Sequence, residues 1–421
     1  MKISIITLGC KVNQYESGAL KEELLKMGHD VSMHLEPADL FVLNTCAVTG
    51  IAEKKSRTHI AKIAKISPNA KVIVCGCASQ HNAEQFLKKP NVSLVLGIAG
   101  KSKIPQILNA VGEMSAEIPN EYENFAFNTT SRTRAYLKIQ DGCNNFCSYC
   151  LIPYLRGRSR SRDLNAIVDE ASELAKTNKE IVLTGIDMSD YKIDGKPALN
   201  QLFEALSDNP CRIRISSLEC NVVDDKLLKT LKSMPNFCPH FHLSMQSGAN
   251  RILKLMNRKY TKEQFVEKVE LIRKYFPNCA ITTDVIVGFP TETDEDFAET
   301  VETIKKCDFY EMHIFPYSKR DGTVASKMQM VDGNVVNQRV KFLGNINKVG
   351  KQKYIENQNK LIEKENKPLL CLTESIENNF VVGFTENYIK IYLPKTAPLH
   401  ELVEVHNLKI FEDGAKANIV N

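Results

Sequence analysis

Three cysteines within one short segment have the spacing of a metal-cluster loop. Cys143, Cys147 and Cys150 are separated by three and then by two residues. Thiolates ligate iron–sulfur clusters, and three of them on one loop can hold a cuboidal cluster while its fourth iron stays open. A paired-knuckle zinc site would need a second cysteine pair, and the neighbouring sequence has none. The segment therefore predicts an iron–sulfur cluster with an open, catalytic iron.

A second set of cysteines is dispersed in the sequence. Cys10, Cys46 and Cys77 each follow an apolar segment that is expected to be a strand. The carboxyl ends of parallel strands meet at one edge of a sheet, so the three thiols are expected to converge there and hold a second cluster. Cys75 is an alternative to Cys77 as the third ligand, but it falls within the strand itself and should point into a core.

Six further cysteines show no ligand spacing and are expected to be small buried residues. They are Cys211, Cys220, Cys238, Cys279, Cys307 and Cys371.

The composition of the chain limits the class of protein that can carry these sites. The chain has 421 residues, of which 43% are hydrophobic and 25% charged, which suits two to three globular domains. No apolar run reaches the roughly 18 residues of a membrane span, and the N-terminus does not have a signal-peptide pattern. We therefore expect a cytoplasmic protein without a membrane partner, in which thirteen cysteines serve as ligands, nucleophiles or inert thiols rather than disulfides.

The elements that position the cysteines can be read from periodicity. Four apolar segments separated by helical patterns predict a doubly wound parallel sheet at the N-terminus. These segments are 3–6, 40–43, 72–74 and 92–96. Six further strand–helix units predict a partial (β/α)6 barrel, because a full barrel would need eight. Their strands are expected at 135–139, 180–184, 212–216, 240–244, 280–287 and 310–315.

Cys143 follows the first of these barrel strands, which places its loop at the carboxyl-terminal mouth of the barrel, where such folds carry their chemistry. A long polar helix at about 335–358 precedes five short apolar segments, which predict a small all-β barrel. The segments are 369–373, 380–384, 389–393, 402–405 and 408–411. We expect four parts in the chain: an N-terminal domain at 1–112, a linker at 113–128, the barrel at 129–360 and the small domain at 361–421.

Several residues at or near the carboxyl ends of the barrel strands could contact the ribose or amino-acid part of a bound cofactor. The candidates are Gly185, Asp187, Ser217, Glu219, Gln246, Asp284, Pro316 and Tyr317. Each could equally be a helix cap or a turn residue.

Basic residues are concentrated in two places. Between 338 and 367 there are eight basic and three acidic residues, a difference of +5 that equals the net charge of the chain. Candidates for phosphate contact are Lys348, Lys351 and Lys353 there, and Arg156, Arg158, Arg160 and Arg162 beside the cluster loop. The alternatives are a solvated helix face and arginines that brace the loop. Tyr388 and Tyr392 of the small barrel are candidates for either RNA contact or core.

The cysteine loop and four further segments together resemble the methylthiotransferases of the radical S-adenosylmethionine superfamily. The segments are 155–162, 243–248, 284–292 and 315–323. The resemblance extends over nearly the whole chain and implies that the small C-terminal domain is an RNA-binding TRAM-like barrel. Within the family, segment 7–17 is similar to the branch that acts on N6-threonylcarbamoyladenosine at position 37 of tRNA.

The resemblance also implies the cofactors and partners. It implies two 4Fe–4S clusters, a radical-generating one at the barrel loop and a sulfur-carrying one in the N-terminal domain. Two S-adenosylmethionine molecules would be used in each turnover, one as methyl donor and one as radical source. A low-potential electron donor, a sulfur source and the anticodon stem-loop of tRNA would be the partners.

Two alternatives stay open. The same chemistry could act on isopentenyladenosine in tRNA or on an aspartate of a ribosomal protein. The chain could also be a non-catalytic iron–sulfur protein that binds RNA and senses redox state, which would form no 5′-deoxyadenosine.

Overall fold

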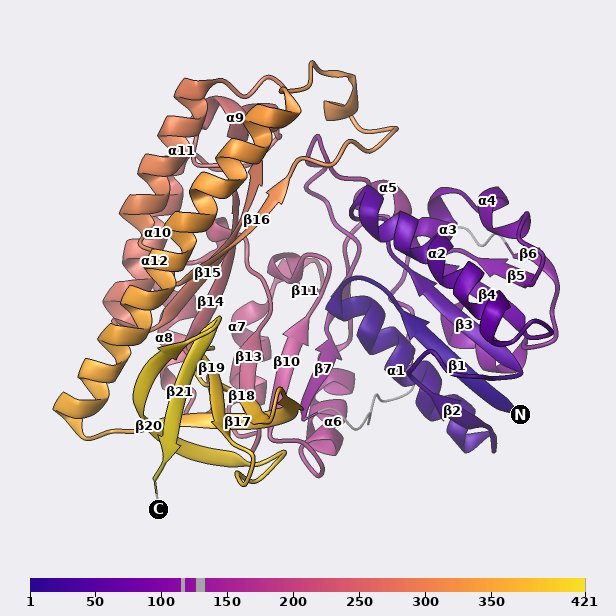
Figure 1. The fold of residues 1–421 in the computed structure, drawn as a ribbon, viewed down its shortest axis with the longest axis horizontal. Coiled ribbons are helices and arrows are strands. Elements are labelled where there is room, and N and C mark those ends of the chain that lie inside the picture. Colours follow the sequence, from indigo (N-terminus) through magenta and orange to yellow (C-terminus); the bar gives the residue numbers. More distant parts are fainter. Residues whose placement is uncertain (115–117, 126–132, 421) are drawn as a thin grey trace.

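The computed structural model describes residues 1–114, 118–125 and 133–420. Figure 1 shows an N-terminal sheet domain beside an open barrel, with a small closed barrel at the lower end of that open barrel and the long helix α12 (Gly333–Glu365) along its outer side. Part of the predicted linker, at 115–117 and 126–128, lies outside the described residues. The described helices include none that is long and apolar enough to cross a bilayer.

The N-terminal domain is the predicted doubly wound sheet. Its six parallel strands lie in the order β2-β1-β3-β4-β5-β6. The strands are β1 (Lys2–Thr7), β2 (Asp30–Ser32), β3 (Leu40–Thr45), β4 (Lys71–Gly76), β5 (Val92–Leu96) and β6 (Gly112–Met114). The helices are α1 (Lys11–Lys26), α2 (Gly50–Ile66), α3 (Cys77–His81) and α4 (Glu84–Leu87). The edge strands β2 and β6 have three residues each, too few to show an alternation, and so were not predicted.

Helix α1 begins earlier than its apolar pattern indicates. Its first turns bury the polar Asn13, Glu16 and Ser17 together with Val12 and Tyr15, and this mixture hides the hydrophobic periodicity before Leu20. Buried polar groups need partners, and the site described below supplies them.

The central domain is a six-stranded open barrel, as predicted. Strands β7 (Arg134–Lys138), β10 (Glu180–Thr184) and β13 (Arg212–Ile215) form one parallel sheet. Strands β14 (His240–Gln246), β15 (Ala280–Val287) and β16 (Glu311–Pro316) form the other, and parallel bridges from Ile213 to Phe237 and from Leu218 to Leu243 join the two. The main helices around them are α6 (Leu164–Leu174), α7 (Leu199–Leu206), α8 (Asp225–Ser233), α10 (Lys262–Tyr275) and α11 (Asp294–Cys307). The smaller elements are β8 (Gln140–Asp141), α5 (Ile152–Arg156), β9 (Arg160–Ser161), β11 (Lys192–Ile193), β12 (Lys196–Pro197) and α9 (Asn250–Leu255).

The C-terminal strands close into a barrel in the order β17-β18-β19-β21-β20. They are β17 (Leu369–Glu377), β18 (Phe380–Thr385), β19 (Lys390–Pro394), β20 (Leu402–Phe411) and β21 (Gly414–Ile419). The two strands predicted at 402–405 and 408–411 are one strand, β20, with an irregularity between His406 and Lys409. Strand β21 was missed because its buried residues include only the small Ala415 and Ala417.

The closed barrel is joined to the open barrel by buried charges. Arg212 and Arg214 of β13 both bind Glu180 of β10, at 2.5 and 2.6 Å, and all three side chains are almost inaccessible to solvent. The same guanidinium groups donate to the carbonyl oxygens of Leu370 (2.6 Å) and Thr385 (3.0 Å) in the closed barrel. Glu180 thus holds the two arginines that dock the C-terminal domain.

Glu180 gives a prediction for acid stability. Burial opposes its ionisation, but Arg214 and Arg212 lower its pKa from the ordinary 4.5 to about 2. Because the folded-state pKa is the lower one, the stabilisation is present above about pH 4.5 and is lost as the pH falls toward 2, by up to about 3 kcal/mol. We expect Glu180→Gln to unfold at lower urea concentration at pH 7 and to lose less stability than the unmodified chain between pH 5 and 3. An equal loss of stability between pH 5 and 3 in the variant and in the unmodified chain would contradict this role. The control is Glu173→Gln, which removes one carboxylate of an exposed pair with Lys176.

Candidate active site

The loop with Cys143, Cys147 and Cys150 follows β8 at the mouth of the open barrel. Each sulfur accepts a hydrogen bond at 3.4 Å: Cys143 from the Asn145 N–H, Cys150 from the Ile152 N–H and Cys147 from the Arg258 guanidinium. Donors of this kind stabilise sulfur that carries negative charge, as in a cluster ligand.

The loop holds its shape by local contacts. Phe146 has a positive φ of 48°, and the Asn257 amide binds the carbonyl oxygens of Asn145 and Phe146 at 3.2 and 2.9 Å. Burial raises the pKa of Cys150 to about 12, and the charges of Cys147 and Cys77 add to that rise. Thiols in such a place ionise when a bound cation compensates them, so the loop fits an iron–sulfur cluster.

The second set of cysteines lies at one edge of the N-terminal sheet. Cys10 caps α1, Cys46 follows β3 and Cys77 begins α3, so all three lie at the carboxyl edge of that sheet. Burial raises the pKa of Cys46 to about 12, and the charges of Cys77 and Cys10 raise it further. At Gly9, with φ of 96°, an added Cβ would approach the Cys46 Cβ to 2.5 Å, so this approach requires glycine.

Cys75 points elsewhere, as expected. It is fully buried in the core cluster that contains Ile3 and Leu20, whereas Cys77 belongs to the cluster with Ile6.

Arg156 connects the two cysteine sets. Its fully buried guanidinium donates to Cys77 Sγ at 3.3 Å and to Asn13 Oδ1 at 2.7 Å. It also binds Asp141 at 2.9 Å and Glu16 at 3.1 Å, so it joins α1 of the N-terminal domain to the start of the barrel loop. Burial opposes its charge, but Asp141 and Glu16 raise the pKa of Arg156 well above its usual value.

Two lysines complete this buried network. Lys138 binds Glu16 at 2.8 Å and Asp141 at 2.7 Å, and Lys101 also contacts Glu16. Together with Arg156, and with Arg160 at 4.0 Å from Asp141, four cations therefore meet two carboxylates, and positive charge is in excess. Cys77 accepts a hydrogen bond from Arg156 and so lies beside this excess charge.

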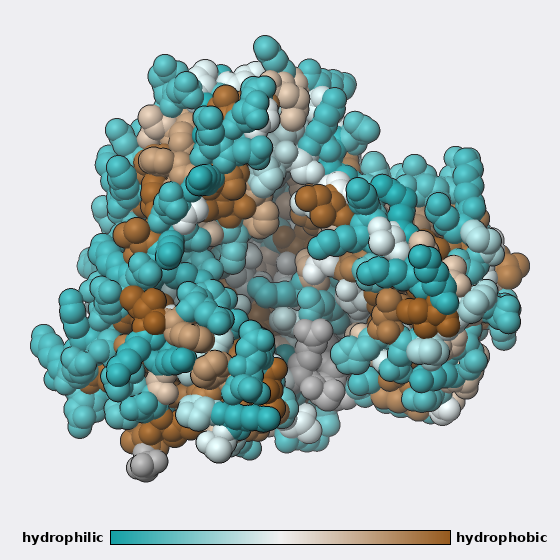
Figure 2. Space-filling model, in the orientation of Figure 1, coloured by the Kyte–Doolittle hydropathy of each residue, from teal (hydrophilic) through white to brown (hydrophobic). Residues whose placement is uncertain are grey.

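A cavity of about 450 Å³ lies where the three domains meet. The space-filling view is hollowed between the N-terminal lobe and the rest of the molecule (Figure 2). Cys10 and Lys11 line the cavity from the N-terminal domain, and Tyr388 lines it from the closed barrel. Most of its other wall residues lie on the strands of the open barrel or directly after them, including Arg134, Arg214, Ser216, Ser217, His240, His242, Asp284, His313 and Phe315.

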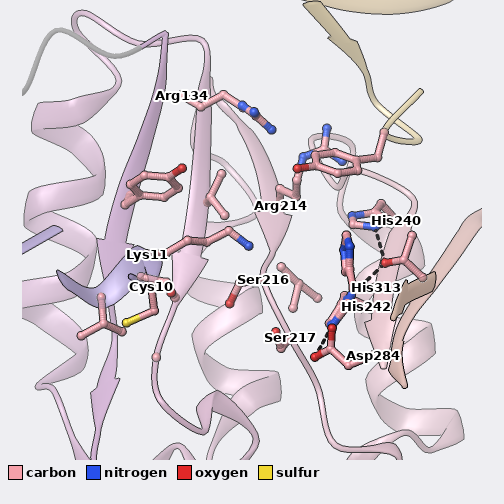
Figure 3. A pocket seen from close by; sticks show the side chains of 18 of the residues that line it. Cys10, Lys11, Arg134, Arg214, Ser216, Ser217, His240, His242, Asp284 and His313 are labelled. Carbon is pink, nitrogen blue, oxygen red and sulfur yellow. Dashed lines mark hydrogen bonds and ion pairs between the residues drawn. The ribbon is translucent and has the colours of Figure 1, made fainter. Parts of the chain in front are cut away.

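The wall of the cavity is strongly basic. Figure 3 shows Lys11 and Arg134 on one side, three histidines with Asp284 on the other, and Arg214 between them. Burial lowers the pKa of Lys11 to about 8, and Arg134 and Arg214 contribute to this shift. Burial opposes ionisation of Asp284, but the hydrogen bond from His242, with 3.3 Å between the nearest atoms, lowers its pKa below the usual value.

Tyr388 is part of the site rather than of the barrel core. It has a positive φ of 69°, its ring stacks on His240 at 4.5 Å, and the guanidinium groups of Arg214 and Arg134 lie over it at 5.0 and 5.5 Å. Tyr392, by contrast, is buried within the closed barrel.

The predicted cofactor residues fall into three groups. Gly185, Ser217 and Asp284 line the cavity. Asp187 and Glu219 lie at the cysteine loop, because Asp187 binds the Asn145 amide at 2.9 Å and Glu219 contacts Arg258. Burial and the charges of Glu219 and Asp190 raise the pKa of Asp187 to about 6. The remaining three, which the structure describes, lie outside the cavity lining: Gln246, Pro316 and Tyr317.

For three of the four arginines, the structure corrects the prediction of RNA contact. Arg156, Arg160 and Arg162 are buried. Arg160 donates to the carbonyl oxygens of Arg156 and Arg158 at 2.8 Å, and Arg162 contacts Glu170. They brace the loop from inside and do not form a nucleic-acid surface, because their side chains are almost inaccessible to solvent.

The other basic candidates remain at the surface. Arg158 is exposed and lies over the Phe146 ring at 4.4 Å, and Lys348 on α12 is also exposed. Lys351 and Lys353 are each paired with a carboxylate at 2.7 Å, Glu311 and Asp308 respectively.

The comparisons with known proteins agree with this geometry. Residues 137–304 match the family model of the Radical SAM superfamily, and residues 2–97 match one described as Uncharacterized protein family UPF0004. The fold, the cysteine loop at the barrel mouth and this match define a radical S-adenosylmethionine enzyme. A protein of Kitasatospora setae, the radical S-adenosylmethionine methyltransferase TsrM, shares the fold with a TM-score of 0.57 over 77% of this chain and 76% of its own, at 15% identity.

The relatives by sequence are closer. A Bacillus subtilis (strain 168) protein named threonylcarbamoyladenosine tRNA methylthiotransferase MtaB is 38% identical over 99% of this chain and 95% of its own length. An Aquifex aeolicus protein of the same name is 39% identical over 96% and 100%. A protein of Thermoanaerobacter sp. (strain X514) named tRNA-2-methylthio-N(6)-dimethylallyladenosine synthase is 36% identical over 85% and 80%. The chain therefore belongs to the methylthiotransferase family of radical S-adenosylmethionine enzymes, and the resemblance noted in the sequence is confirmed.

Proposed function

We propose that the chain is a tRNA methylthiotransferase that acts on carbon 2 of N6-threonylcarbamoyladenosine at position 37, in the cytoplasm. The observation that carries this proposal is the single cavity that has Cys10 on its wall, opens within the barrel and is edged by basic and aromatic side chains. Relatives that are named for this substrate cover nearly the whole chain at 38 and 39% identity.

We propose that the two cysteine sets hold two 4Fe–4S clusters, Cys143, Cys147 and Cys150 the radical-generating one and Cys10, Cys46 and Cys77 the sulfur-carrying one. The hydrogen bonds to sulfur in the first set and the excess positive charge beside Cys77 in the second set support this assignment. When bound, the clusters and two molecules of S-adenosylmethionine would supply the radical and the methylthio group.

The chain's own residues would bind and orient the reactants. Gly185 lies on the cavity wall and packs against Gln140, where an added Cβ would meet Oε1 at 2.9 Å. Ser217 and Asp284 offer polar groups in the cavity, and Asp187 and Glu219 offer carboxylates beside the first cysteine set. We propose that these side chains hold S-adenosylmethionine, since its amino and ribose groups are donors.

The surface around the cavity would bind the RNA. We propose that the exposed Arg158 and Lys348 contact phosphates and that Lys351 and Lys353 add positive charge along α12. The closed barrel would act as the TRAM-like RNA-binding module. A low-potential electron donor and a sulfur source complete the proposed partners.

The substrate can be tested with the reconstituted enzyme, S-adenosylmethionine and a low-potential reductant. We expect 2-methylthio product from tRNA that carries N6-threonylcarbamoyladenosine. We expect much less from tRNA that carries N6-dimethylallyladenosine and none from ribosomal protein. If the enzyme modifies one of the other two substrates preferentially, that substrate takes the place of the proposed one. If no 5′-deoxyadenosine forms under any condition, the result favours a redox sensor.

A further inference from the structure

We propose that Lys11, with Arg134 beside it, binds the carboxylate of the substrate's threonyl group and so selects this substrate over one with a hydrocarbon substituent at N6, an inference that rests on the proposed function. A threonylcarbamoyl group ends in a carboxylate, whereas a dimethylallyl group has no charge. A cation on the wall of the substrate cavity would recognise this difference.

Lys11 is a cation without a counter-ion. It is the first residue of α1, directly after Cys10, and its side chain extends into the cavity (Figure 3). Among the described residues, none forms a hydrogen bond or ion pair with its ammonium group. A partly buried ammonium group that lacks a partner is unfavourable, so a ligand with negative charge would remove a cost that the empty site carries.

The other two cations of this wall are already engaged by the protein. Arg214 binds Glu180 and the carbonyl oxygen of Thr385. Arg134 uses its Nε and Nη2 atoms for Glu374, at 2.6 and 3.0 Å, and its Nη1 forms no hydrogen bond or ion pair with the described residues. Lys11 therefore has the free charge, and Arg134 can add one donor to the same ligand.

A bound metal cation would be a different explanation of the opposite wall. Single ligand atoms of His242, Asp284 and His313 lie within 4.8 Å of one another, and two histidines with a carboxylate can hold a divalent ion. However, Lys11, Arg134 and Arg214 line the same cavity, and the only carboxylate on its described wall accepts a hydrogen bond from His242. The excess of cationic side chains favours an anion over a divalent cation.

The position of Lys11 suits the geometry of the reaction. Carbon 2 and N6 belong to the same purine, so an adenine whose carbon 2 faces the cysteine set of Cys10 carries its N6 substituent in the adjacent part of the cavity. Lys11 is the residue next to Cys10, and its flexible chain reaches that part of the wall. A charge-assisted hydrogen bond of this kind changes affinity by about 10- to 100-fold.

The experiment measures the affinity of the reconstituted full-length enzyme for anticodon stem-loops, without reductant so that no turnover occurs. Three stem-loops carry at position 37 N6-threonylcarbamoyladenosine, its neutral threoninamide analogue or unmodified adenosine. We expect the unmodified chain to bind the first at least about 10-fold more tightly than the threoninamide. Lys11→Met should lose this preference and Lys11→Arg should keep most of it.

A matched control lies on the same helix. Lys26 at the other end of α1 is exposed and paired with Glu23, so Lys26→Met removes the same charge and should keep the preference. The threoninamide analogue removes the charge from the ligand instead of the protein, so the test does not depend on the folding of a variant. In a double-mutant cycle, Lys11→Met and the amide should each have little effect once the other is present.

The outcomes distinguish a failure of the Lys11 proposal from a failure of the proposed function. If the unmodified chain discriminates but Lys11→Met discriminates equally well, Lys11 has no role in specificity and the proposed function stands. Lys11 likewise has no role in specificity if Lys11→Met changes only the electron paramagnetic resonance spectrum of the N-terminal cluster. If the unmodified chain binds all three stem-loops equally and, in a parallel assay with reductant, forms no methylthio product from the first, the proposed function itself fails.

Discussion

Cys46→Ala is expected to leave the reductive cleavage of S-adenosylmethionine intact while it lowers methylthiolation by about 100-fold or more, whereas Cys147→Ala is expected to abolish both. The reason is that the two cysteines belong to different sets, which lie in different domains. Cys147 lies in the loop at the barrel mouth, and Cys46 lies at the edge of the N-terminal sheet. Loss of Cys46 removes a ligand of one set without a contact to the other.

The measurement is the amount of 5′-deoxyadenosine and of methylthio nucleoside formed by each variant, together with its iron content. We expect about eight iron atoms in the unmodified chain and about four in either variant. Cys75→Ala is the control, because this neighbour of Cys77 is buried in the core and should keep both reactions. Methylthio product from Cys46→Ala at the unmodified rate would refute the assignment of two clusters.

Arg156→Met is expected to lower the free energy of unfolding by about 3–5 kcal/mol, because it breaks a buried ionic network at the junction of two domains. Glu16, Asp141 and the Asn13 amide oxygen lose their shared donor, and Cys77 loses its hydrogen bond. Methionine fills much of the same volume, so the effect would come from the lost hydrogen bonds and charge rather than from a cavity.

Urea unfolding of the cluster-free chain, followed by circular dichroism, measures this effect. Arg158→Met is the matched control, since Arg158 lies two residues away but is exposed, and it should change stability by less than about 0.5 kcal/mol. A loss for Arg156→Met as small as that of the control would mean that the network does not hold the domains together.

Much of the fold could be predicted from the sequence because its regular parts depend on local patterns. The six barrel strands are short apolar runs, each followed by an amphipathic helix, and helix α10 begins after Thr261 with a capping box. The convergence of Cys10, Cys46 and Cys77 also follows from local information, since each ends a parallel strand and such ends share one edge.

The charged residues could not be placed in the same way. Glu16 and Arg156 are 140 positions apart in the chain, and their burial depends on each other. An arginine beside a cluster loop suggests phosphate binding when it is considered alone, and only the tertiary structure supplies the carboxylates that satisfy it. Arg212 and Arg214 are a second such case. They lie on a buried strand, and charges on a buried strand need partners elsewhere in the fold.

Tyr388 and Lys11 show what depends on the assembly of domains. Tyr388 belongs to the closed barrel, yet its ring stacks on His240 of the open barrel. Lys11 is a polar residue at the start of a helix, and nothing local distinguishes it from a solvated lysine. Both become parts of the cavity because three domains meet there.

The most direct test of the account is mass spectrometry of tRNA nucleosides from cells that lack the gene and from the same cells with the gene restored. We expect the 2-methylthio form of N6-threonylcarbamoyladenosine to be absent without the gene, the unmethylthiolated form to accumulate, and restoration to reverse both. An identical nucleoside profile with and without the gene would contradict the proposed function, and a change confined to the dimethylallyl nucleoside would assign the enzyme to that substrate instead.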